Sequence, residues 1–200
     1  GKDVVGIAET GTGKTAAFLL PLIQNAIANK HAQALIMVPT RELAVQIEEE
    51  FRAFSRGLGL YACVLIGGAP MGKQLRELRY FNHFIIGTPG RSKDMIERGA
   101  LNITSFEALV LDEADRMLDM GFVDDMRRIL SKVPSDAQKL FFSATLAPEI
   151  ENLVNTFLVK PIKVMVKTRD TSKNVEQNVV RVPRGASKID SLHDVLIAEG

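Results

Sequence analysis

The sequence predicts an α/β fold built on a mostly parallel sheet with helices on both faces. Short apolar runs alternate along the chain with longer amphipathic segments, which is the pattern of repeated βαβ units. Several of these runs are apolar at every position, as expected of strands that are buried on both faces. The 200 residues include 46% hydrophobic and 24% charged residues, which is typical of a globular domain with a sizeable core.

The expected elements follow one another at short intervals along the chain. Apolar runs predict strands at 4–8, 34–38, 61–66, 83–86, 108–111, 139–142 and 162–166. Helical periodicity predicts helices at 14–28, 41–58, 72–81, 90–98, 123–133 and 148–157. The helix over 123–133 carries a core-facing stripe made of Val123, Met126, Ile129, Leu130 and Val133.

The composition changes near Lys167. Residues 167–174 are polar and without periodicity, so we interpret them as a linker. A further strand at 175–183 and a helix at 186–198 follow, and one strand with one helix cannot bury a core of its own. We therefore expect one α/β domain over 1–166, a linker over 167–174, and the beginning of a second domain over 175–200.

Charge and cysteine content exclude several classes of protein. The net charge is +1, so any nucleic-acid site must be a local cluster of basic residues. Cys63 is the only cysteine and lies in an apolar run, which predicts a buried thiol, no disulfide and a reducing, cytoplasmic location. No run is long enough to span a membrane, and no signal-peptide pattern opens the chain.

A candidate phosphate-binding loop lies between the first expected strand and the first expected helix, and consists of Ala8, Glu9, Thr10, Gly11, Thr12, Gly13, Lys14 and Thr15. Its glycines allow successive backbone N–H groups to point at an anion, and the helix N-terminus adds positive potential. We expect Lys14 to reach the β- and γ-phosphates and the hydroxyl of Thr15 to ligate Mg²⁺. Ala8 stands where the strict pattern has glycine.

Carboxylates follow the expected strand at 108–111. Ligands of such sheets bind beyond the carboxyl ends of the strands, where the phosphate loop also lies. Asp112 is therefore the candidate Mg²⁺ ligand, and Glu113 is the candidate base for an attacking water. A run of this kind in a chain without a phosphate loop would be interpreted as a solvated turn.

Two strand ends share a threonine followed by an arginine, one over Pro39, Thr40, Arg41 and Glu42, the other over Thr88, Pro89, Gly90 and Arg91. Each threonine can cap the next helix, but an arginine at the positive end of a helix dipole is mildly unfavourable. The pair of arginines therefore suggests an extended anion lying across both strand ends.

Three further groups of residues are candidates for the same edge of the sheet. Gly67 and Gly68, after a third strand, would let that anion approach the backbone. A basic helix face of Lys73, Arg76 and Arg79 could extend the anion site, or could be a solvated face. Small hydroxyl-bearing side chains in the segment Ser143, Ala144 and Thr145 could bond to the acidic run and relay the state of the nucleotide.

In this order along the chain, the motifs resemble those of the DEAD-box ATP-dependent RNA helicases. The resemblance covers 1–166 and implies a RecA-like N-terminal lobe of a two-lobe core, and residues 175–200 resemble the opening of the second lobe. It implies that ATP and Mg²⁺ are bound by residues 8–15 and Asp112, that Glu113 activates the hydrolytic water, and that Asp115 with residues 143–145 couples hydrolysis to unwinding. It also implies sequence-independent contact with the RNA backbone by residues 39–42, 67–68 and 88–91.

The match to the family pattern is incomplete at both ends. The upstream glutamine-bearing segment that recognises adenine is absent, and so are the second lobe's arginines that complete the ATP site. We therefore expect a monomer that is nearly inactive as an isolated fragment. Two alternatives remain open: a DNA-translocating helicase of the same superfamily, and a nucleotide-gated RNA clamp that needs no turnover of its own.

Overall fold

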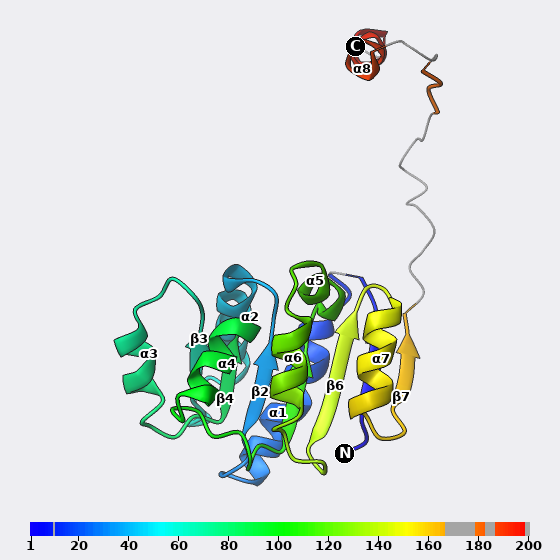
Figure 1. Cartoon of the computed structure of the whole chain (residues 1–200). Coiled ribbons are helices and arrows are strands. Elements are labelled where there is room, and N and C mark those ends of the chain that lie inside the picture. Colours follow the sequence, from blue (N-terminus) through cyan, green and yellow to red (C-terminus); the bar gives the residue numbers. More distant parts are fainter. Residues whose placement is uncertain (10, 167–178, 183–186, 199–200) are drawn as a thin grey trace. The chain divides into compact units, whose positions relative to one another are not determined.

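The computed structural model describes residues 1–9, 11–166, 179–182 and 187–198 (Figure 1). The chain divides into two units, Gly1–Thr168 and Arg169–Gly200. The first unit contains seven strands: β1 Val4–Ile7, β2 Ala34–Met37, β3 Ala62–Leu65, β4 Phe84–Gly87, β5 Ala108–Leu111, β6 Gln138–Ser143 and β7 Ile162–Met165. They form a single sheet in the order β3-β4-β2-β5-β6-β1-β7, and every pair is parallel. The predicted parallel sheet is confirmed.

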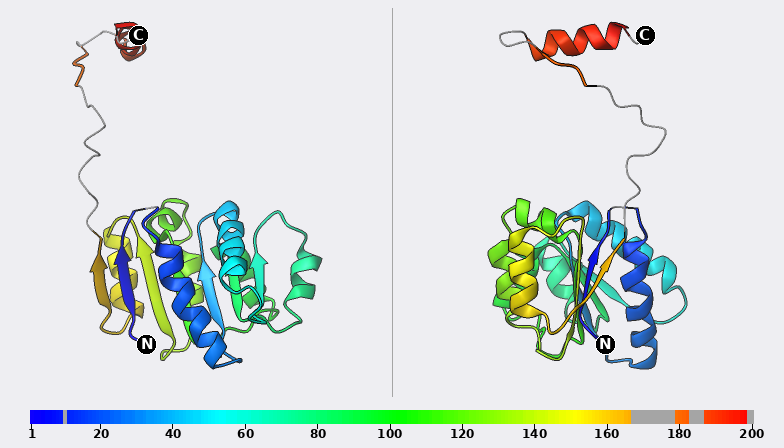
Figure 2. Two further views of the ribbon diagram at one scale, coloured as in Figure 1. Left: turned by 180° about the vertical axis from the view of Figure 1, so that it is seen from behind. Right: turned by 90° about the vertical axis from the view of Figure 1, so that its right-hand side faces the viewer.

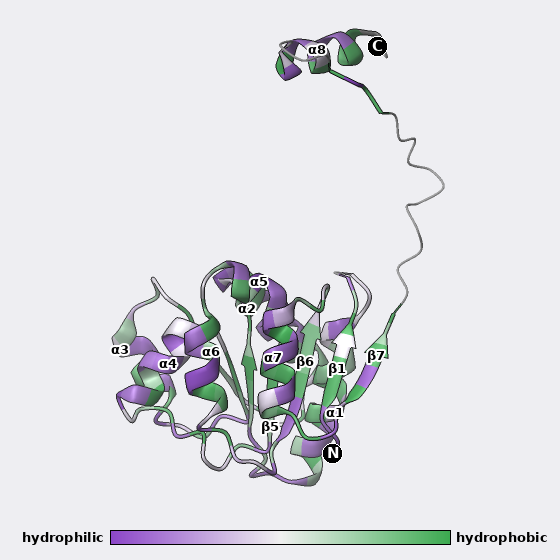
Figure 3. Ribbon diagram, turned by 45° about the vertical axis from the view of Figure 1, so that its right-hand side comes forward, coloured by the Kyte–Doolittle hydropathy of each residue, from purple (hydrophilic) through white to green (hydrophobic). Residues whose placement is uncertain are grey.

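Helices cover both faces of this sheet (Figures 1 and 2). Those of the first unit are α1 Lys14–Ala28, α2 Arg41–Phe54, α3 Met71–Glu77, α4 Pro89–Glu97, α5 Ala114–Asp119, α6 Val123–Leu130 and α7 Pro148–Phe157. One core cluster joins the sheet to α1 and α2, and the other joins it to α4, α5, α6 and α7. Neighbouring residues of β2 alternate between the clusters, since Leu35 belongs to one and Ile36 to the other. The apolar strands between mixed helices stand out in Figure 3.

Helix ends differ from the prediction in places. Helix α2 ends at Phe54 instead of residue 58, because Gly57 and Gly59 adopt left-handed φ angles of 78° and 67° that a helix cannot contain. Helix α3 spans seven residues and ends at Glu77, short of residue 81. Helix α6 ends at Leu130, although Val133 beyond it is still buried.

Helix α5 was not predicted from the sequence. Its six residues begin inside the acidic run, and they are too few to display a helical period. Ala114 and Met117 are fully buried, so tertiary packing holds this short helix in place. The acidic run is therefore the start of a helix and not an open turn.

The second unit is described at residues 179–182 and 187–198. The latter contains α8 Lys188–Ala198, close to the predicted helix at 186–198. Residues 179–182, inside the predicted strand at 175–183, have no regular secondary structure. The predicted linker at 167–174 lies outside the described residues.

Two further expectations can be compared with the structure. Cys63 is buried, and burial together with the neighbouring Glu77 carboxylate raises the pKa of its thiol to about 12. Among the described residues, none of the helices has the length and apolar character needed to cross a lipid bilayer.

Candidate active site

The predicted phosphate loop connects β1 to α1 at the carboxyl edge of the sheet (Figure 1). Gly11 and Gly13 have φ angles of 82° and 88°, in the left-handed region that favours glycine. Helix α1 has no side-chain cap at Gly13 and no acidic residue in its first turn. Its N-terminal N–H groups and its positive dipole end are therefore available to an anion. Thr10, also predicted in this loop, lies outside the described residues.

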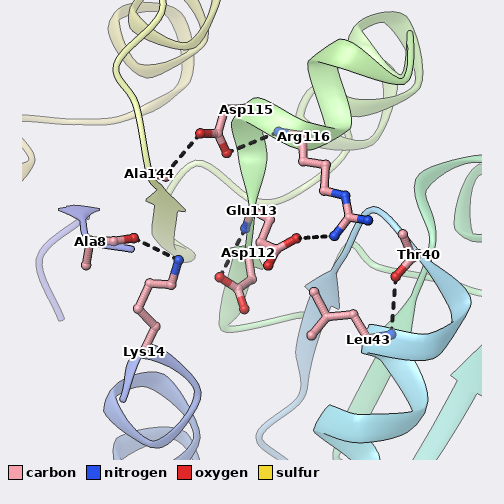
Figure 4. A network of polar contacts seen from close by, with 9 residues as sticks. All are labelled: Ala8, Lys14, Thr40, Leu43, Asp112, Glu113, Asp115, Arg116 and Ala144. Atoms are coloured by element: carbon pink, nitrogen blue, oxygen red, sulfur yellow. Dashed lines mark hydrogen bonds and ion pairs between the residues drawn. The ribbon is translucent and has the colours of Figure 1, made fainter. Parts of the chain in front are cut away.

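Side chains of the loop bond to its own carbonyl groups. The ammonium of Lys14 donates a hydrogen bond to the carbonyl oxygen of Ala8 at 2.9 Å (Figure 4). The hydroxyl of Thr12 donates to the carbonyl oxygen of Glu9 at 2.8 Å. Ala8 is buried and its N–H donates to the carbonyl oxygen of Ser143, so the strand end tolerates a methyl group where the strict pattern has glycine.

A cleft of about 610 Å³ opens beside this loop. It is lined by Gly11, Gly13, Lys14, Thr15, Ala16, Thr40, Glu42, Leu43, Gln46, Glu50, Asp112, Glu113 and Arg116. We call it the nucleotide cleft. It brings together the predicted lysine, the predicted Mg²⁺ ligands Thr15 and Asp112, and the predicted base Glu113, whereas Ala8, Glu9 and Thr12 are not among its lining residues.

Asp112 directly follows β5, and the residue is 3% exposed. Burial raises the pKa of its carboxyl to about 6, and the nearby Lys14 ammonium and the Glu113 N–H partly oppose this rise. Its Oδ1 accepts a hydrogen bond from that N–H at 3.0 Å. A desolvated carboxylate beside a hydroxyl side chain suits a hard divalent cation. Within the described residues no cluster of three His, Cys, Asp or Glu side chains could chelate a metal, so Mg²⁺ would keep waters or phosphate oxygens as ligands.

Glu113 adopts a left-handed conformation with φ 52°, which is strained for a residue with a Cβ atom. Its side chain is 16% exposed, and Arg116 Nη1 donates to its Oε2 at 3.1 Å (Figure 4). The ion pair joins two side chains that both line the nucleotide cleft. Arg116 was not predicted from the sequence. Its position three residues after Glu113 could have indicated an ion pair, because residues three apart on a helix are neighbours.

Asp115 joins the acidic run to the segment 143–145 (Figure 4). Its Oδ2 accepts hydrogen bonds from Ala144 N at 3.1 Å, Thr145 N at 3.0 Å and Thr145 Oγ1 at 3.1 Å. Its own N–H donates to Ser143 Oγ at 3.3 Å. Burial by itself raises the pKa of Asp115, but the hydrogen bonds from Thr145, Ser143 and Arg116 outweigh it and lower the pKa.

Ser143 links this network to the phosphate loop. Its carbonyl oxygen accepts the N–H of Ala8 at 3.0 Å, and its hydroxyl accepts the N–H of Asp115. Two hydrogen bonds thus connect the end of β1 with the start of α5 through one buried residue. The predicted contact between the hydroxyl segment and the acidic run is present in the structure.

A second cleft, of about 550 Å³, lies beyond the carboxyl ends of β2, β3 and β4. It is lined by Pro39, Thr40, Arg41, Glu42, Gly67, Thr88, Gly90, Arg91, Asp94, Met120 and Phe122. We call it the backbone cleft, because it gathers most of the residues predicted to hold a sugar–phosphate backbone. Pro89 and Gly68 are not among the lining residues. Thr40 and Glu42 line both clefts, so the N-terminus of α2 is a wall that they share.

Gln74 holds the loop that follows β3. The residue is 2% exposed, and its Nε2 donates to the carbonyl oxygens of Ile66 at 3.0 Å and Ala69 at 3.4 Å. Arg91 Nη1 donates to the same Ala69 carbonyl at 3.4 Å. The loop with Gly67 and Gly68 is therefore clamped at both ends by a glutamine that was not predicted from the sequence.

The capping prediction holds at one strand end only. Thr40 Oγ1 accepts a hydrogen bond from Leu43 N at 3.3 Å, as predicted for a helix cap. The Thr88 hydroxyl makes no such bond, although Pro89 takes the predicted first helical position. Pro89 has no N–H, so this helix start has one donor fewer to satisfy.

The predicted basic face of Lys73, Arg76 and Arg79 is wrong as a single helix face. Helix α3 ends at Glu77, so Arg79 lies in the turn beyond it. Lys73 pairs with Glu77 at 3.8 Å on the exposed surface. None of the three lines the backbone cleft.

The parallel sheet, the glycine-bearing loop after β1 and the carboxylates after β5, two strands away from β1, define a RecA-like P-loop NTPase domain. The chain belongs to the DEAD/DEAH box helicase family, whose family model matches residues 1–153. It is 44% identical over 200 residues to the RNA helicase CrhR of Synechocystis sp.. It is 44% identical over 195 residues to the DEAD-box ATP-dependent RNA helicase CshA of Streptococcus pneumoniae.

These matches cover 100% and 96% of this chain, but only 41% and 37% of the two relatives. The chain therefore spans about two fifths of the length of these curated relatives. Among solved structures, a DEAD box protein from Methanococcus jannaschii matches with a TM-score of 0.80 and 38% identity. That match covers 84% of this chain and 46% of the other chain.

Proposed function

We propose that this chain is the N-terminal lobe of an ATP-dependent RNA helicase, and that it binds ATP with Mg²⁺ in the nucleotide cleft and single-stranded RNA in the backbone cleft. The wall that the two clefts share at Thr40 and Glu42 carries this proposal. If a ligand in one cleft shifts α2, the shape of the other cleft changes as well. Nucleotide-dependent RNA binding requires such a connection. The names of the relatives favour RNA over DNA as the polymer.

The nucleotide cleft supplies charge and position for phosphoryl transfer. Lys14 and the N-terminus of α1 stabilise the phosphates, and Thr15 with Asp112 would hold Mg²⁺. When bound there, Mg²⁺ would neutralise charge that develops on the phosphate oxygens. Glu113, which accepts a hydrogen bond from Arg116, orients the attacking water and accepts its proton. An RNA clamp that does not hydrolyse ATP needs no such base. The presence of Glu113 in the cleft therefore supports an ATP-hydrolysing helicase over the clamp.

The network around Asp115 couples the nucleotide to the rest of the lobe. Ser143 contacts both Ala8 and Asp115, so a shift of the phosphate loop moves the start of α5. Residues 144–145 move with the start of α5, because three donors of this segment bond to Asp115 Oδ2. This arrangement supports a role for Asp115 and residues 143–145 in transmitting hydrolysis.

The backbone cleft offers donors to phosphates and little that reads bases. Arg41 and Arg91 line it from two different strand ends, together with the N-termini of α2 and α4. Helix N-termini and arginines bind phosphate oxygens without regard to sequence. Single-stranded RNA of any sequence is the ligand that fits this chemistry.

The domain organisation belongs to this proposal. Residues 1–166 form the lobe described above, 167–174 connect it, and 175–200 begin a second RecA-like lobe. Apolar side chains of α8 support this, because Ile189, Leu192 and Leu196 are 78%, 60% and 66% exposed and need a core to cover them. We further propose that the protein acts as a monomer in the cytoplasm.

Phosphate release by residues 1–200 and by a longer protein with a complete second lobe tests the proposal. The short chain should hydrolyse ATP barely above background, because the arginine that contributes about 10³–10⁵-fold in this class comes from the second lobe. The longer protein should be stimulated by RNA more than by DNA. Equal stimulation by both polymers would favour the DNA helicase, and full RNA binding without any turnover would favour the clamp.

A further inference from the structure

A row of rings lies at the amino ends of β3, β4 and β2, at the edge of the sheet opposite to both clefts. Tyr61 directly precedes β3, His83 directly precedes β4, and His31 lies just before β2. The ring centroids of Tyr61 and His83 are 6.2 Å apart, those of His83 and Phe81 are 4.9 Å apart, and those of Phe81 and His31 are 6.2 Å apart. We call these four residues the ring row.

The backbone of three neighbouring strands holds the ring row in place. His83 N donates to the carbonyl oxygen of Tyr61 at 2.9 Å, and Ala34 N donates to the carbonyl oxygen of His83 at 2.9 Å. The N–H of Tyr61 donates to Nδ1 of the His83 ring at 3.2 Å, and His83 is 6% exposed. Hydrogen bonds therefore tie two of the four ring residues, Tyr61 and His83, to the ends of the strands.

Its outer members are open to solvent. Tyr61 is 62% exposed and Phe81 is 45% exposed, and Tyr80, next in the chain to Phe81, is 77% exposed. The protein contains only 2 Tyr and no Trp, and both tyrosines lie at this edge. Aromatic side chains that stay largely exposed in the folded chain and lie close together leave apolar faces that a ligand can cover.

The chain segments that contain the ring row carry a net positive charge. The segments 29–33, 52–61 and 79–83, which lead into β2, β3 and β4, contain Lys30, Arg52, Arg56 and Arg79 and no Asp or Glu. Arg52 pairs with Glu48. Lys30, Arg56 and Arg79 have no ion-pair partner among the described residues. Glu107 also reaches this edge, where its Oε1 accepts a hydrogen bond from Asn29 Nδ2 at 2.6 Å.

We infer that the ring row, the adjacent Tyr80 and their basic neighbours form a second contact for single-stranded RNA. Bases stack on the exposed rings of Tyr61, Tyr80 and Phe81, and phosphates pair with Lys30, Arg56 and Arg79. Exposed aromatic rings beside unpaired cations are the combination that single-stranded nucleic acids require, because every base has a face that can stack. An apolar protein partner would not need the unpaired cations.

The second contact extends the proposed function. That its ligand is RNA rests on the proposed function. The same three strands carry the backbone cleft at their carboxyl ends and the ring row at their amino ends. The two sites are therefore separate, and a long strand bound at one end can be retained by the other. Such a second contact slows dissociation of the RNA.

Fluorescence anisotropy of a labelled oligouridylate with residues 1–200 tests this contact. The variant Tyr80→Leu with Phe81→Leu keeps bulk but removes the π faces, whereas Tyr80→Phe keeps the stacking surface. The double leucine variant should weaken binding at least about fivefold, since stacking contributes about 1–3 kcal/mol per base. Tyr80→Phe should bind like the unchanged protein, and Arg79→Gln should make the salt slope shallower by about 0.7.

Arg41→Ala with Arg91→Ala separates this contact from the backbone cleft. Residual binding by that variant, lost on adding the leucine substitutions, supports the second contact. If only the arginine substitutions weaken binding, the ring row is not an RNA site and a protein partner is favoured, while the proposed function stands. If RNA binds to none of these proteins, both the second contact and the RNA part of the proposed function are wrong.

Discussion

The guanidinium of Arg41 lies so close to the backbone of Gly68 that a Cβ atom on Gly68 would fall 2.1 Å from Arg41 Nη1. Gly68 also has a φ angle of 77°, in the left-handed region. A glycine from the loop after β3 thus makes room for an arginine from the start of α2. Both residues belong to the predicted backbone contact, and their packing fixes where that arginine can lie.

Gly68→Ala should displace Arg41 and weaken RNA binding several-fold. The left-handed conformation should add a cost of about 1–2 kcal/mol to folding. Gly72→Ala is the control, because Gly72 does not line the backbone cleft and a Cβ atom there would meet only Arg76 Nη1, at 3.8 Å. RNA titrations and denaturant unfolding of both variants check this, and equal losses in both would contradict the packing argument.

Gln74→Met should loosen the loop after β3 while keeping side-chain length. It leaves the carbonyl oxygen of Ile66 without its donor, and an unpaired buried group costs about 1–3 kcal/mol, whereas the carbonyl oxygen of Ala69 keeps its hydrogen bond from Arg91 Nη1. RNA binding should weaken, and ATP binding should not change, because Gln74 does not line the nucleotide cleft. Lys73→Met, at the exposed neighbouring position, is the control and should affect neither.

Glu113→Gln should abolish ATP turnover in a protein with both lobes and leave nucleotide binding within a few-fold, because the amide keeps the shape but cannot accept a proton. Arg116→Ala should lower turnover less, since it removes only the hydrogen bond that positions the Glu113 carboxylate. Lys14→Ala should instead weaken nucleotide binding itself. Near-normal steady-state hydrolysis by Glu113→Gln would mean that another group is the base.

Asp112→Asn should stabilise the metal-free protein at neutral pH. Burial raises the pKa of Asp112 from 3.8 to about 6, so the folded chain keeps a proton that the unfolded chain has already lost. The folded state therefore loses stability as the pH rises from 3.8 to about 6. The amide avoids this loss, which is on the order of 3 kcal/mol at most.

Denaturant titrations in EDTA at pH 7.5 and pH 4 check the sign of this effect. The gain from Asp112→Asn should be present at the higher pH and shrink at the lower one, where the carboxyl of the unchanged protein is already protonated. A gain of equal size at both pH values would show that charge burial is not its cause.

Asp115→Asn should separate ATP hydrolysis from duplex unwinding. Its Oδ2 accepts hydrogen bonds from Ala144 N, Thr145 N and Thr145 Oγ1, and one amide cannot replace that acceptor for every donor. In a protein with both lobes, we expect fewer strands separated per ATP hydrolysed. Thr145→Val, which removes only the hydroxyl donor, should have the same effect in weaker form. An unchanged ratio would assign the network to stability alone.

Local patterns were enough to predict most of the fold. The alternation of apolar runs with amphipathic segments predicted the parallel sheet, because buried parallel strands need apolar residues at every position. The predicted bounds of α1 and α7 agree with the structure. The glycines, Lys14 and Thr15 were recognisable because phosphate binding imposes residue types at fixed spacing.

Only the tertiary structure decided which strand ends meet and which side chains hold the site. The strand order brings the loop after β1 and Asp112 into one cleft and gathers the ends of β2, β3 and β4 into another, and strand order is not encoded in any single run. No periodic pattern in the sequence marks Arg116, Gln74 or helix α5. The two side chains act through single hydrogen bonds, and the helix is too short to display a period. The sequence by itself therefore determined the elements and the chemistry of the phosphate loop, and packing of the sheet determined the shared wall between the two clefts.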